Sequence, residues 1–309
     1  MNENKIFVTG LFGMTSFFHV NAFPKEGQTI RSKTSFYEVG GKGYNQAYTA
    51  KKLGASVNFY TAIGNDFFSE RLIYELEKDN FGYFRFDDIP NDFACVVIDN
   101  TSDNYVILNK GASTKISEKH ISSIKDLIVH NKGVLIQNEI PIEANYRILK
   151  IAHENGLITV FDPAPITNEL KRSTDIFRFC DVVKPNWGEA TELTNSKIDD
   201  SPLSVASRLQ DLGAKNVVIT RGSQGAFVLT EAGESFCQPI WPVTSIDTTG
   251  AGDVFSAALC VSLCENKTIH EAVAFASAAS AISVTRGGVI SAIPNREEIY
   301  DLINKQSLY

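Results

Sequence analysis

Hydrophobic residues along the chain occur in short runs of β-branched and aliphatic side chains, separated by amphipathic stretches. From Lys115 onward the two patterns alternate regularly. A short apolar run bounded by turn residues predicts a buried strand, and apolar residues three and four positions apart predict a helix. The predicted strands of this part are 133–137, 157–162, 181–184, 216–220 and 226–230, and the predicted helices are 117–129, 142–155, one beginning near residue 167, and 203–212.

This alternation predicts an α/β fold with a doubly wound, mostly parallel sheet flanked by helices. The earlier part of the chain is less regular. It contains strands over 6–9 and 57–63, helices over 47–53 and 67–78, and two further β segments, 28–39 and the hairpin 94–109. Because no helix separates the last two, we expect a small second sheet, a lid formed by about 13–39 and 93–110. No linker or repeat divides the chain, so we expect a single domain over 1–309.

Polar and glycine-rich segments follow the predicted strand ends. In doubly wound sheets, ligands bind beyond the carboxyl ends of the strands. We therefore expect these segments to meet at one edge of the sheet. They are Glu139, Asp162, Asn186 with Glu189, the loop 222–225, and the segment 247–253.

The segment DTTGAGD over residues 247–253 carries the clearest chemistry. It leads into the small and apolar run 254–263, which predicts a helix. A helix start offers free N–H groups and the positive end of the helix dipole, so Gly250, Ala251 and Gly252 can hold an anion. Asp253 would lie beside that anion as a base for an attacking hydroxyl. The segment predicts phosphoryl transfer.

A second glycine cluster, GGKGYNQA over residues 40–47, places Lys42 and Asn45 at another helix start. We expect it to contact a ligand. It is not a Walker A loop, because Lys42 is followed by Gly43 rather than by Ser or Thr. A dinucleotide-dependent oxidoreductase would share the sheet, but the glycines at 10 and 13 lack the third glycine of that fingerprint.

Composition narrows the class of protein. Hydrophobic residues make up 43% and charged residues 21% of the 309 residues, and the net charge is −7. The negative charge argues against nonspecific binding to nucleic acid or to a membrane surface. No signal-peptide pattern or long apolar stretch is present, and the five cysteines are scattered, so we expect a cytoplasmic protein with reduced thiols. Cys260 and Cys264 share a helix face, where we expect core packing rather than a metal site.

With these motifs the chain resembles the ribokinase (PfkB) family of ATP-dependent sugar kinases over nearly its whole length. The motifs are GGKGYNQA over 40–47, KPNWGE over 184–189, TRGSQG over 220–225, DTTGAGD over 247–253 and TRGG over 285–288. The resemblance implies a parallel sheet with a β lid over the sugar. It also implies transfer from ATP, Mg²⁺ and a monovalent cation, usually K⁺, and it makes a homodimer through the lid plausible.

The resemblance assigns roles to individual residues. Asp253 is the general base, and Gly250, Ala251 and Gly252 form the anion hole. The sugar contacts correspond to Gly13, Thr15, Gly41, Lys42, Asn45 and Glu139. The ATP site corresponds to Asn186, Thr220, Gly222, Ser223, Gly225 and Ser277. Mg²⁺ is held through water by Asn186 and Glu189, and K⁺ lies near Asp247, Thr249, Ser283, Arg286 and Gly288.

The sugar site departs from the family pattern. Ribokinases carry Asn-x-Asp after the first strand, and the aspartate binds two adjacent hydroxyls, whereas this chain has Gly13-Met14-Thr15. We infer that the substrate is not ribose or is held differently. Lys42, Lys110 and Arg31 suit an acidic or phosphorylated sugar, and Phe12, Met14 and Phe17 suit a larger or less polar one. A nucleoside or sugar-phosphate kinase, or a regulatory protein that binds ATP and sugar without turnover, stay as alternatives.

Overall fold

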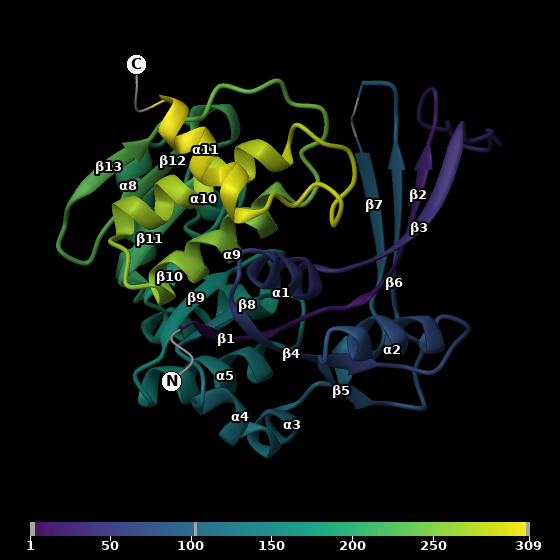
Figure 1. The fold of residues 1–309 in the computed structure, drawn as a ribbon, viewed down its shortest axis with the longest axis horizontal. Coiled ribbons are helices and arrows are strands. Elements are labelled where there is room, and N and C mark those ends of the chain that lie inside the picture. The colour runs from purple at the N-terminus through teal and green to yellow at the C-terminus, as the bar shows by residue number, and fades with distance from the viewer. Residues whose placement is uncertain (1–3, 102–103, 307–309) are drawn as a thin grey trace.

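The structure is a computed structural model, and it describes residues 4–101 and 104–306. Within these residues the main sheet has nine strands in the order β13-β12-β11-β10-β9-β8-β1-β4-β5 (Figure 1). Neighbouring strands are parallel except at β12, which is antiparallel to both β11 and β13. The strands are β1 (Lys5–Thr9), β4 (Ser56–Ile63), β5 (Gly82–Arg85), β8 (Gly133–Gln137), β9 (Ile158–Asp162), β10 (Val182–Val183), β11 (Asn216–Thr220), β12 (Ala226–Leu229) and β13 (Ser235–Gln238). The predicted doubly wound sheet is confirmed.

Helices cover both faces of this sheet. They are α1 (Lys42–Lys52), α2 (Ser69–Lys78), α3 (Glu118–Ser123), α4 (Lys125–Val129), α5 (Ile142–Glu154), α6 (Asn168–Arg172), α7 (Trp187–Leu193), α8 (Pro202–Asp211), α9 (Ala251–Cys264), α10 (Ile269–Ser283) and α11 (Arg296–Gln306). Figure 1 shows α10 and α11 on one side of the sheet and α3, α4 and α5 on the other. In the part of the chain that is described, no helix combines the length and the apolar character that a membrane crossing requires.

Alternate residues of the buried strands enter two separate cores. In β1, Ile6 and Val8 belong to the core beneath α1, α9 and α10, whereas Phe7 belongs to the core beneath α5 and α8. Side chains of a strand alternate between the two faces, so a strand covered on both faces is apolar throughout. This is why the central strands read as uninterrupted apolar runs. Cys260 and Cys264 are buried in the first core, as expected.

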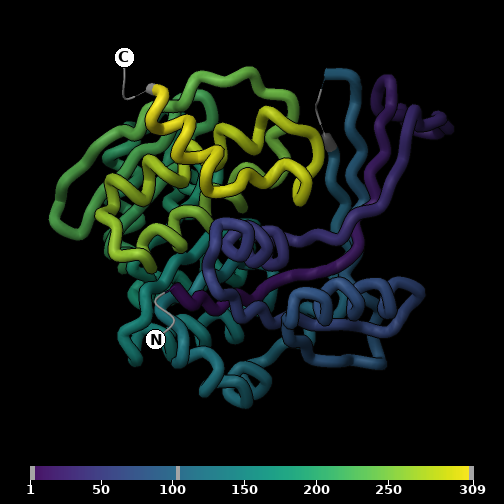
Figure 2. Tube along the Cα trace, in the orientation of Figure 1, coloured from purple at the N-terminus to yellow at the C-terminus, as the bar shows by residue number. Residues whose placement is uncertain are grey.

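A second sheet of four described strands stands beside the main one, in the order β3-β2-β6-β7. Its strands are β2 (Gly13–His19), β3 (Thr34–Gly40), β6 (Asp92–Ile98) and β7 (Asn104–Asn109). Figure 2 shows these segments extending together away from the helical body. The predicted strand over 28–39 begins only at Thr34, so residues 28–33 were assigned wrongly. The reason is that Thr34 pairs with His19, where β2 ends, and no strand continues beyond it.

The predicted helix over 117–129 is also wrong in its middle, where it divides into α3 and α4 at Ile124. Ile124 has φ −110° and ψ 17°, outside the helical region. Just before it, the Ser123 hydroxyl donates to the carbonyl oxygen of His120 at 2.7 Å. Such side-chain bonds to the backbone compete with the helix, and two consecutive serines make the helix weak here. Five further elements, β5, α7, β13, α10 and α11, were not predicted.

A buried ion pair ties the end of β9 to the residue after β10. Lys184 Nζ lies 3.2 Å from Asp162 Oδ2, and their side chains are 4% and 1% exposed. The same ammonium donates to the carbonyl oxygen of Gly252 at 3.3 Å, in the first turn of α9. Burial by itself would raise the pKa of Asp162, but the ammonium groups of Lys184 and then Lys42 hold that pKa below its ordinary value. The pair therefore fixes two strand ends and a helix start together.

We predict that Lys184→Met lowers the free energy of unfolding by about 3–5 kcal/mol, because it leaves the Asp162 carboxylate buried without its cation. Urea unfolding at pH 7 measures this value. Adding Asp162→Asn to Lys184→Met removes the stranded charge and should recover much of the loss. Lys171→Met is the matched control, since it breaks the exposed pair between Lys171 and Glu192, and should cost less than about 1 kcal/mol. Equal losses in Lys184→Met and Lys171→Met would contradict the argument.

Candidate active site

A cavity of about 310 Å³ lies where the small sheet faces the carboxyl edge of the main sheet. Residues from both sheets line it. All six predicted substrate residues are among them, together with two of the predicted catalytic residues: Gly13, Thr15, Gly41, Lys42, Asn45, Glu139, Gly250 and Asp253. Segments more than 200 residues apart in the sequence therefore meet around one cavity.

The Asp253 carboxylate lies in the first turn of α9, is almost fully buried, and is held by three donors. Asn45 Nδ2 donates to its Oδ2 at 2.9 Å. Gln46 Nε2 and Lys42 Nζ donate to its Oδ1 at 3.0 and 3.4 Å. All three donors belong to the first turns of α1, so the start of one helix orients the carboxylate at the start of the other. A base whose position is fixed in this way is suited to accept a proton from a bound hydroxyl.

The start of α9 also offers backbone donors beside that carboxylate. Gly250 has φ 76°, a left-handed conformation that favours glycine, and a Cβ there would lie 2.7 Å from a methyl group of Val289. The N–H of Ala251 donates to the carbonyl oxygen of Thr248 at 3.2 Å, whereas those of Gly250 and Gly252 have no backbone acceptor in the described residues. Unpaired N–H groups at a helix start are able to hold an anion.

Lys42 and Glu139 are two further charged residues that line the cavity. The backbone N–H of Lys42 donates to Glu139 Oε2 at 2.8 Å. Burial raises the pKa of Glu139 to about 8, against the opposing charge of Lys42, and the carboxylate of Asp253 raises it further. Burial would lower the pKa of Lys42, but Asp253, Asp162 and Glu139 together raise it well above its ordinary value. At neutral pH, Lys42 is therefore an ammonium and Glu139 keeps its proton.

The predicted nucleotide residues lie on a neighbouring loop. Thr220 ends β11 and forms a bridge with Asn186, and Gly222, Ser223 and Gly225 make the turn into β12. Gly222 and Gly225 have φ of 54° and 78°, and a Cβ on Gly225 would lie 2.1 Å from the carbonyl oxygen of Gln238. Ser277 lies apart on α10, and no hydrogen bond of the described residues joins it to this loop.

Asn186 and Glu189 form a reciprocal cap at the start of α7. The N–H of Glu189 donates to Asn186 Oδ1 at 2.9 Å, and the N–H of Asn186 donates to Glu189 Oε2 at 2.7 Å. The second carboxylate oxygen of Glu189, Oε1, is not used in this cap. Burial raises the pKa of Glu189, and the charge of Asp162 also raises it. Mg²⁺ prefers oxygen ligands and retains several waters. Glu189 Oε1 is therefore suited to contact Mg²⁺ through a water molecule. Within residues 4–101 and 104–306, no group of three His, Cys, Asp or Glu side chains that could hold a metal ion directly occurs.

The predicted cation residues are only partly brought together. Asp247 Oδ1 accepts from the N–H of Thr249 at 2.9 Å and its Oδ2 from that of Gly288 at 3.2 Å, so it joins two loops. Thr249 Oγ1 is buried and has no partner among the described residues. The side chain of Arg286 points instead to Glu298, and the hydroxyl of Ser283 donates to the carbonyl oxygen of Ser280. From Arg286, a ligand atom would have to be the backbone carbonyl oxygen, whereas the hydroxyl oxygen of Ser283 keeps its lone pairs.

Gln46 was missed as a site residue, although it lies inside the GGKGYNQA motif. Its Nε2 donates to Asp253 Oδ1 at 3.0 Å and to Asp162 Oδ2 at 3.1 Å, so one amide bridges two carboxylates. Its Oε1 accepts from Gln137 Nε2 at 2.6 Å. Because that oxygen is taken, the NH₂ group must face the carboxylates. The position of Gln46 four residues after Lys42, on the same helix face, is the signal that could have found it.

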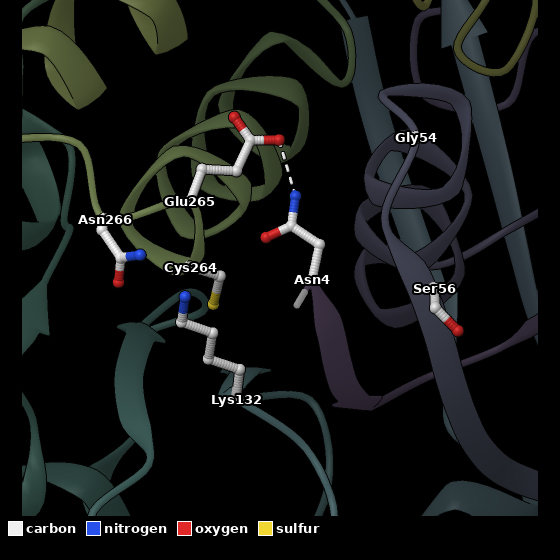
Figure 3. A pocket seen from close by; sticks show the side chains of 7 residues that line it. All are labelled: Asn4, Gly54, Ser56, Lys132, Cys264, Glu265 and Asn266. Atoms are coloured by element: carbon white, nitrogen blue, oxygen red, sulfur yellow. Dashed lines mark hydrogen bonds between the residues drawn. The ribbon is translucent and has the colours of Figure 1, made fainter. Parts of the chain in front are cut away.

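A second hollow of about 300 Å³ lies at the opposite edge of the main sheet, beside Asn4 and Lys132 and the end of α9 (Figure 3). Asn4 Nδ2 donates there to Glu265 Oε1 at 2.6 Å. None of the predicted site residues lines this hollow. It lies at the amino ends of β1 and β8, away from the edge where ligands bind in sheets of this kind.

Comparisons with known proteins agree with the fold. A family model described as the pfkB family carbohydrate kinase matches residues 4–296. A ribokinase of Haemophilus influenzae is 32% identical over 286 residues, which cover 91% of this chain and 92% of that protein. The solved structure of a ribokinase from Thermotoga maritima is similar with a TM-score of 0.87 at 34% identity, over 97% of this chain and 99% of that one.

A third comparison is with Arabidopsis thaliana ribokinase complexed with ribose and ATP. Its structure has a TM-score of 0.83 at 28% identity, over 97% of this chain and 98% of that one. The family model covers nearly the whole chain, and the relatives match over nearly their full lengths. The chain therefore belongs to the pfkB family of carbohydrate kinases.

Proposed function

We propose that this carbohydrate kinase transfers the γ-phosphoryl group of ATP to a hydroxyl of a sugar or sugar derivative held in the cavity beneath the small sheet, with Asp253 as the general base. One observation carries this proposal. A buried carboxylate, fixed by three donors, lines the same cavity as Gly250, and the N–H groups of Gly250 and Gly252 beside it have no backbone acceptor among the described residues. A proton acceptor beside an anion site is the arrangement that phosphoryl transfer to a hydroxyl requires.

The residues divide the reaction between them. Asp253 accepts the proton of the acceptor hydroxyl as its oxygen bonds to the γ-phosphorus and the bond to the departing ADP oxygen breaks. The N–H groups of Gly250 and Gly252 stabilise the charge on the transferring group. Lys42, which remains an ammonium, lies beside Asp253 and adds positive charge on the side of the acceptor. The small sheet, which we interpret as the lid, excludes water from the cavity.

ATP in this proposal lies along the loops of Asn186 and Thr220. Gly222 and Ser223 of the turn are exposed and Gly225 is half-buried, so the backbone of Gly222 and Ser223 can approach a nucleotide closely. Mg²⁺, held through water by Asn186 and Glu189, would neutralise part of the negative charge on the phosphates. Ser277 on α10 is the remaining predicted nucleotide contact.

We further propose a K⁺ site between the loops that Asp247 joins. The buried and unpartnered Thr249 Oγ1 and the two-loop bridge of Asp247 support a cation between Asp247, Thr249 and the backbone of Ser283, Arg286 and Gly288. Turnover should rise when K⁺ replaces the larger tetramethylammonium at constant ionic strength. The same turnover with both cations would remove this part of the proposal.

We also propose a homodimer through the small sheet. Tyr37 and Ile107, on the face of this sheet that points away from the cavity, are 62% and 67% exposed. Exposed apolar side chains gathered on one sheet are typical of an interface. Light scattering after size exclusion should give twice the 34.0 kDa of the chain. A mass of one chain at micromolar concentration would exclude a stable dimer.

The cytoplasm is the location that we propose. All five cysteines are free, which agrees with a reducing compartment. Cell fractionation with a specific antibody tests the location, and recovery with the secreted or membrane fraction would contradict it.

The acceptor is to be identified with a panel of pentoses, hexoses, hexose phosphates and nucleosides, with product masses as the readout. A nucleoside or sugar phosphate as the best acceptor would keep the reaction and change the substrate class. Sugar binding without any phosphorylated product would favour a regulatory protein.

We predict that Asp253→Asn lowers kcat by about 10²- to 10⁴-fold, because the amide cannot accept the proton. ATP affinity, measured by calorimetry, should stay close to that of the unmodified protein. Asp211→Asn, an exposed carboxylate at the end of α8, is the matched control and should keep full activity. Turnover of Asp253→Asn at the rate of the unmodified protein would show that the mechanism is wrong.

A further inference from the structure

The inner face of the small sheet can be determined from the strand register. Gly13, Thr15 and Phe17 of β2 lie opposite Gly40, Glu38 and Phe36 of β3. They also lie beside Asp92, Ala94 and Val96 of β6, and the last two pair with Leu108 and Val106 of β7. Residues directly opposite each other point to the same side of a sheet. All of these residues except Phe36 line the cavity, so this is the face that covers the acceptor.

This face is apolar except at Thr15, Glu38 and Asp92. The oxygens of Asp92 are already occupied, since they accept from the N–H groups of Gly111 and Ser113 and from the Ser113 hydroxyl at 2.8, 2.9 and 2.6 Å. Asp92 therefore holds the chain after β7, and three of the roughly four acceptor positions of its carboxylate are already used. Glu38 is the remaining carboxylate on the face.

Glu38 has an oxygen with no partner. Its Oε2 is buried and accepts no hydrogen bond from the described residues, and none of the ion pairs found within those residues includes Glu38. Burial raises the pKa of Glu38, opposed by a hydrogen bond from the backbone of Val289, and the charge of Asp247 raises it further. A buried carboxylate oxygen without a donor is costly, and a bound hydroxyl would satisfy it.

Glu38 also lies directly opposite the position at which this cavity lacks the carboxylate of ribokinases. Thr15, where ribokinases have the aspartate of Asn-x-Asp, is the direct cross-strand partner of Glu38. Directly opposite Cβ atoms are about 4.5–5.5 Å apart. A carboxylate on β3 with one additional methylene can therefore reach the space that a carboxylate at position 15 would occupy.

We propose that Glu38 is a specificity-determining residue that accepts hydrogen bonds from two adjacent hydroxyls of the acceptor, while the acceptor's less polar side lies against Phe17, Val96 and Leu108. The acceptor class is a sugar or sugar derivative with a vicinal diol. This inference rests on the proposed function, because it assumes that the acceptor occupies this cavity. It makes the diol, rather than a charged group, the feature that the lid recognises.

The test uses Glu38→Gln and the best diol-bearing acceptor of the panel, with its deoxy analogue lacking one hydroxyl of the diol as the second substrate. We expect KM for the diol sugar to rise about 10- to 100-fold, because a charged acceptor of two hydrogen bonds is lost. KM for the deoxy analogue should change much less, and kcat and KM for ATP should stay within about twofold. Calorimetry of sugar binding without ATP gives the same comparison independently of turnover.

Two further variants separate recognition from structure. Thr15→Asp combined with Glu38→Ala returns the carboxylate to β2 and should recover part of the lost affinity for the diol sugar, whereas Glu38→Ala alone should not. Glu26→Gln changes an exposed carboxylate between β2 and β3, and should leave every constant unchanged.

The results distinguish a failure of the role of Glu38 from a failure of the proposed function on which that role rests. An unchanged KM in Glu38→Gln, or equal losses for the diol sugar and its deoxy analogue, overturns the role of Glu38. A change confined to activation by K⁺ assigns Glu38 to the cation site and also overturns it. Glu38-dependent sugar binding without turnover contradicts the proposed function and supports the role of Glu38. If no sugar binds at all, both fail.

Discussion

The arrangement of the site depends on two carboxylates that are buried close together. Asp162 and Asp253 are both buried, and Gln46 bridges them with hydrogen bonds of 3.1 and 3.0 Å. Two ammonium groups balance their charges, since Lys184 pairs with Asp162 and Lys42 with Asp253. Glu139, with a pKa of about 8, keeps its proton near neutrality and adds no third negative charge. Isolated buried charges are expensive, so each of these groups constrains the positions of the others.

This network connects the fold to the reaction. Lys184 donates to the carbonyl oxygen of Gly252, and the Ser256 hydroxyl donates both to that oxygen and to Asp162 Oδ2. The first turn of α9 is therefore attached to the ends of β9 and β10 through side chains rather than through the sheet itself. Because these contacts hold the first turn of α9 in place, its unpaired N–H groups and the Asp253 carboxylate keep fixed positions relative to each other. Catalysis by positioned dipoles requires that the donors do not reorganise during the reaction.

Much of the fold and of the location of the candidate site could be predicted from the sequence, because strand ends and helix starts have local signatures. The strands 133–137 and 216–220 were predicted to the residue, and the residues of five separate segments were correctly expected at one edge. The pairing of Asp162 with Lys184, the bridge by Gln46 and the opposition of Thr15 and Glu38 could not be predicted. Each depends on the register or on the approach of segments from different parts of the chain, and neither leaves a periodic pattern.

The two sides of the cavity differ in how strongly close backbone contacts restrict the residues that line them. On the side of the main sheet, a Cβ on Gly43 would lie 2.6 Å from backbone atoms of Gly10, and one on Gly10 would lie 2.1 Å from Gln137 Oε1. The start of α1, with Lys42 and Asn45, is thus pressed against the turn after β1 and cannot shift without a clash. On the side of the small sheet, Thr15 and Glu38 project from paired strands, where a side chain can be exchanged without moving the backbone. The backbone therefore constrains the residues at the start of α1 more tightly than the side chains that project from the small sheet.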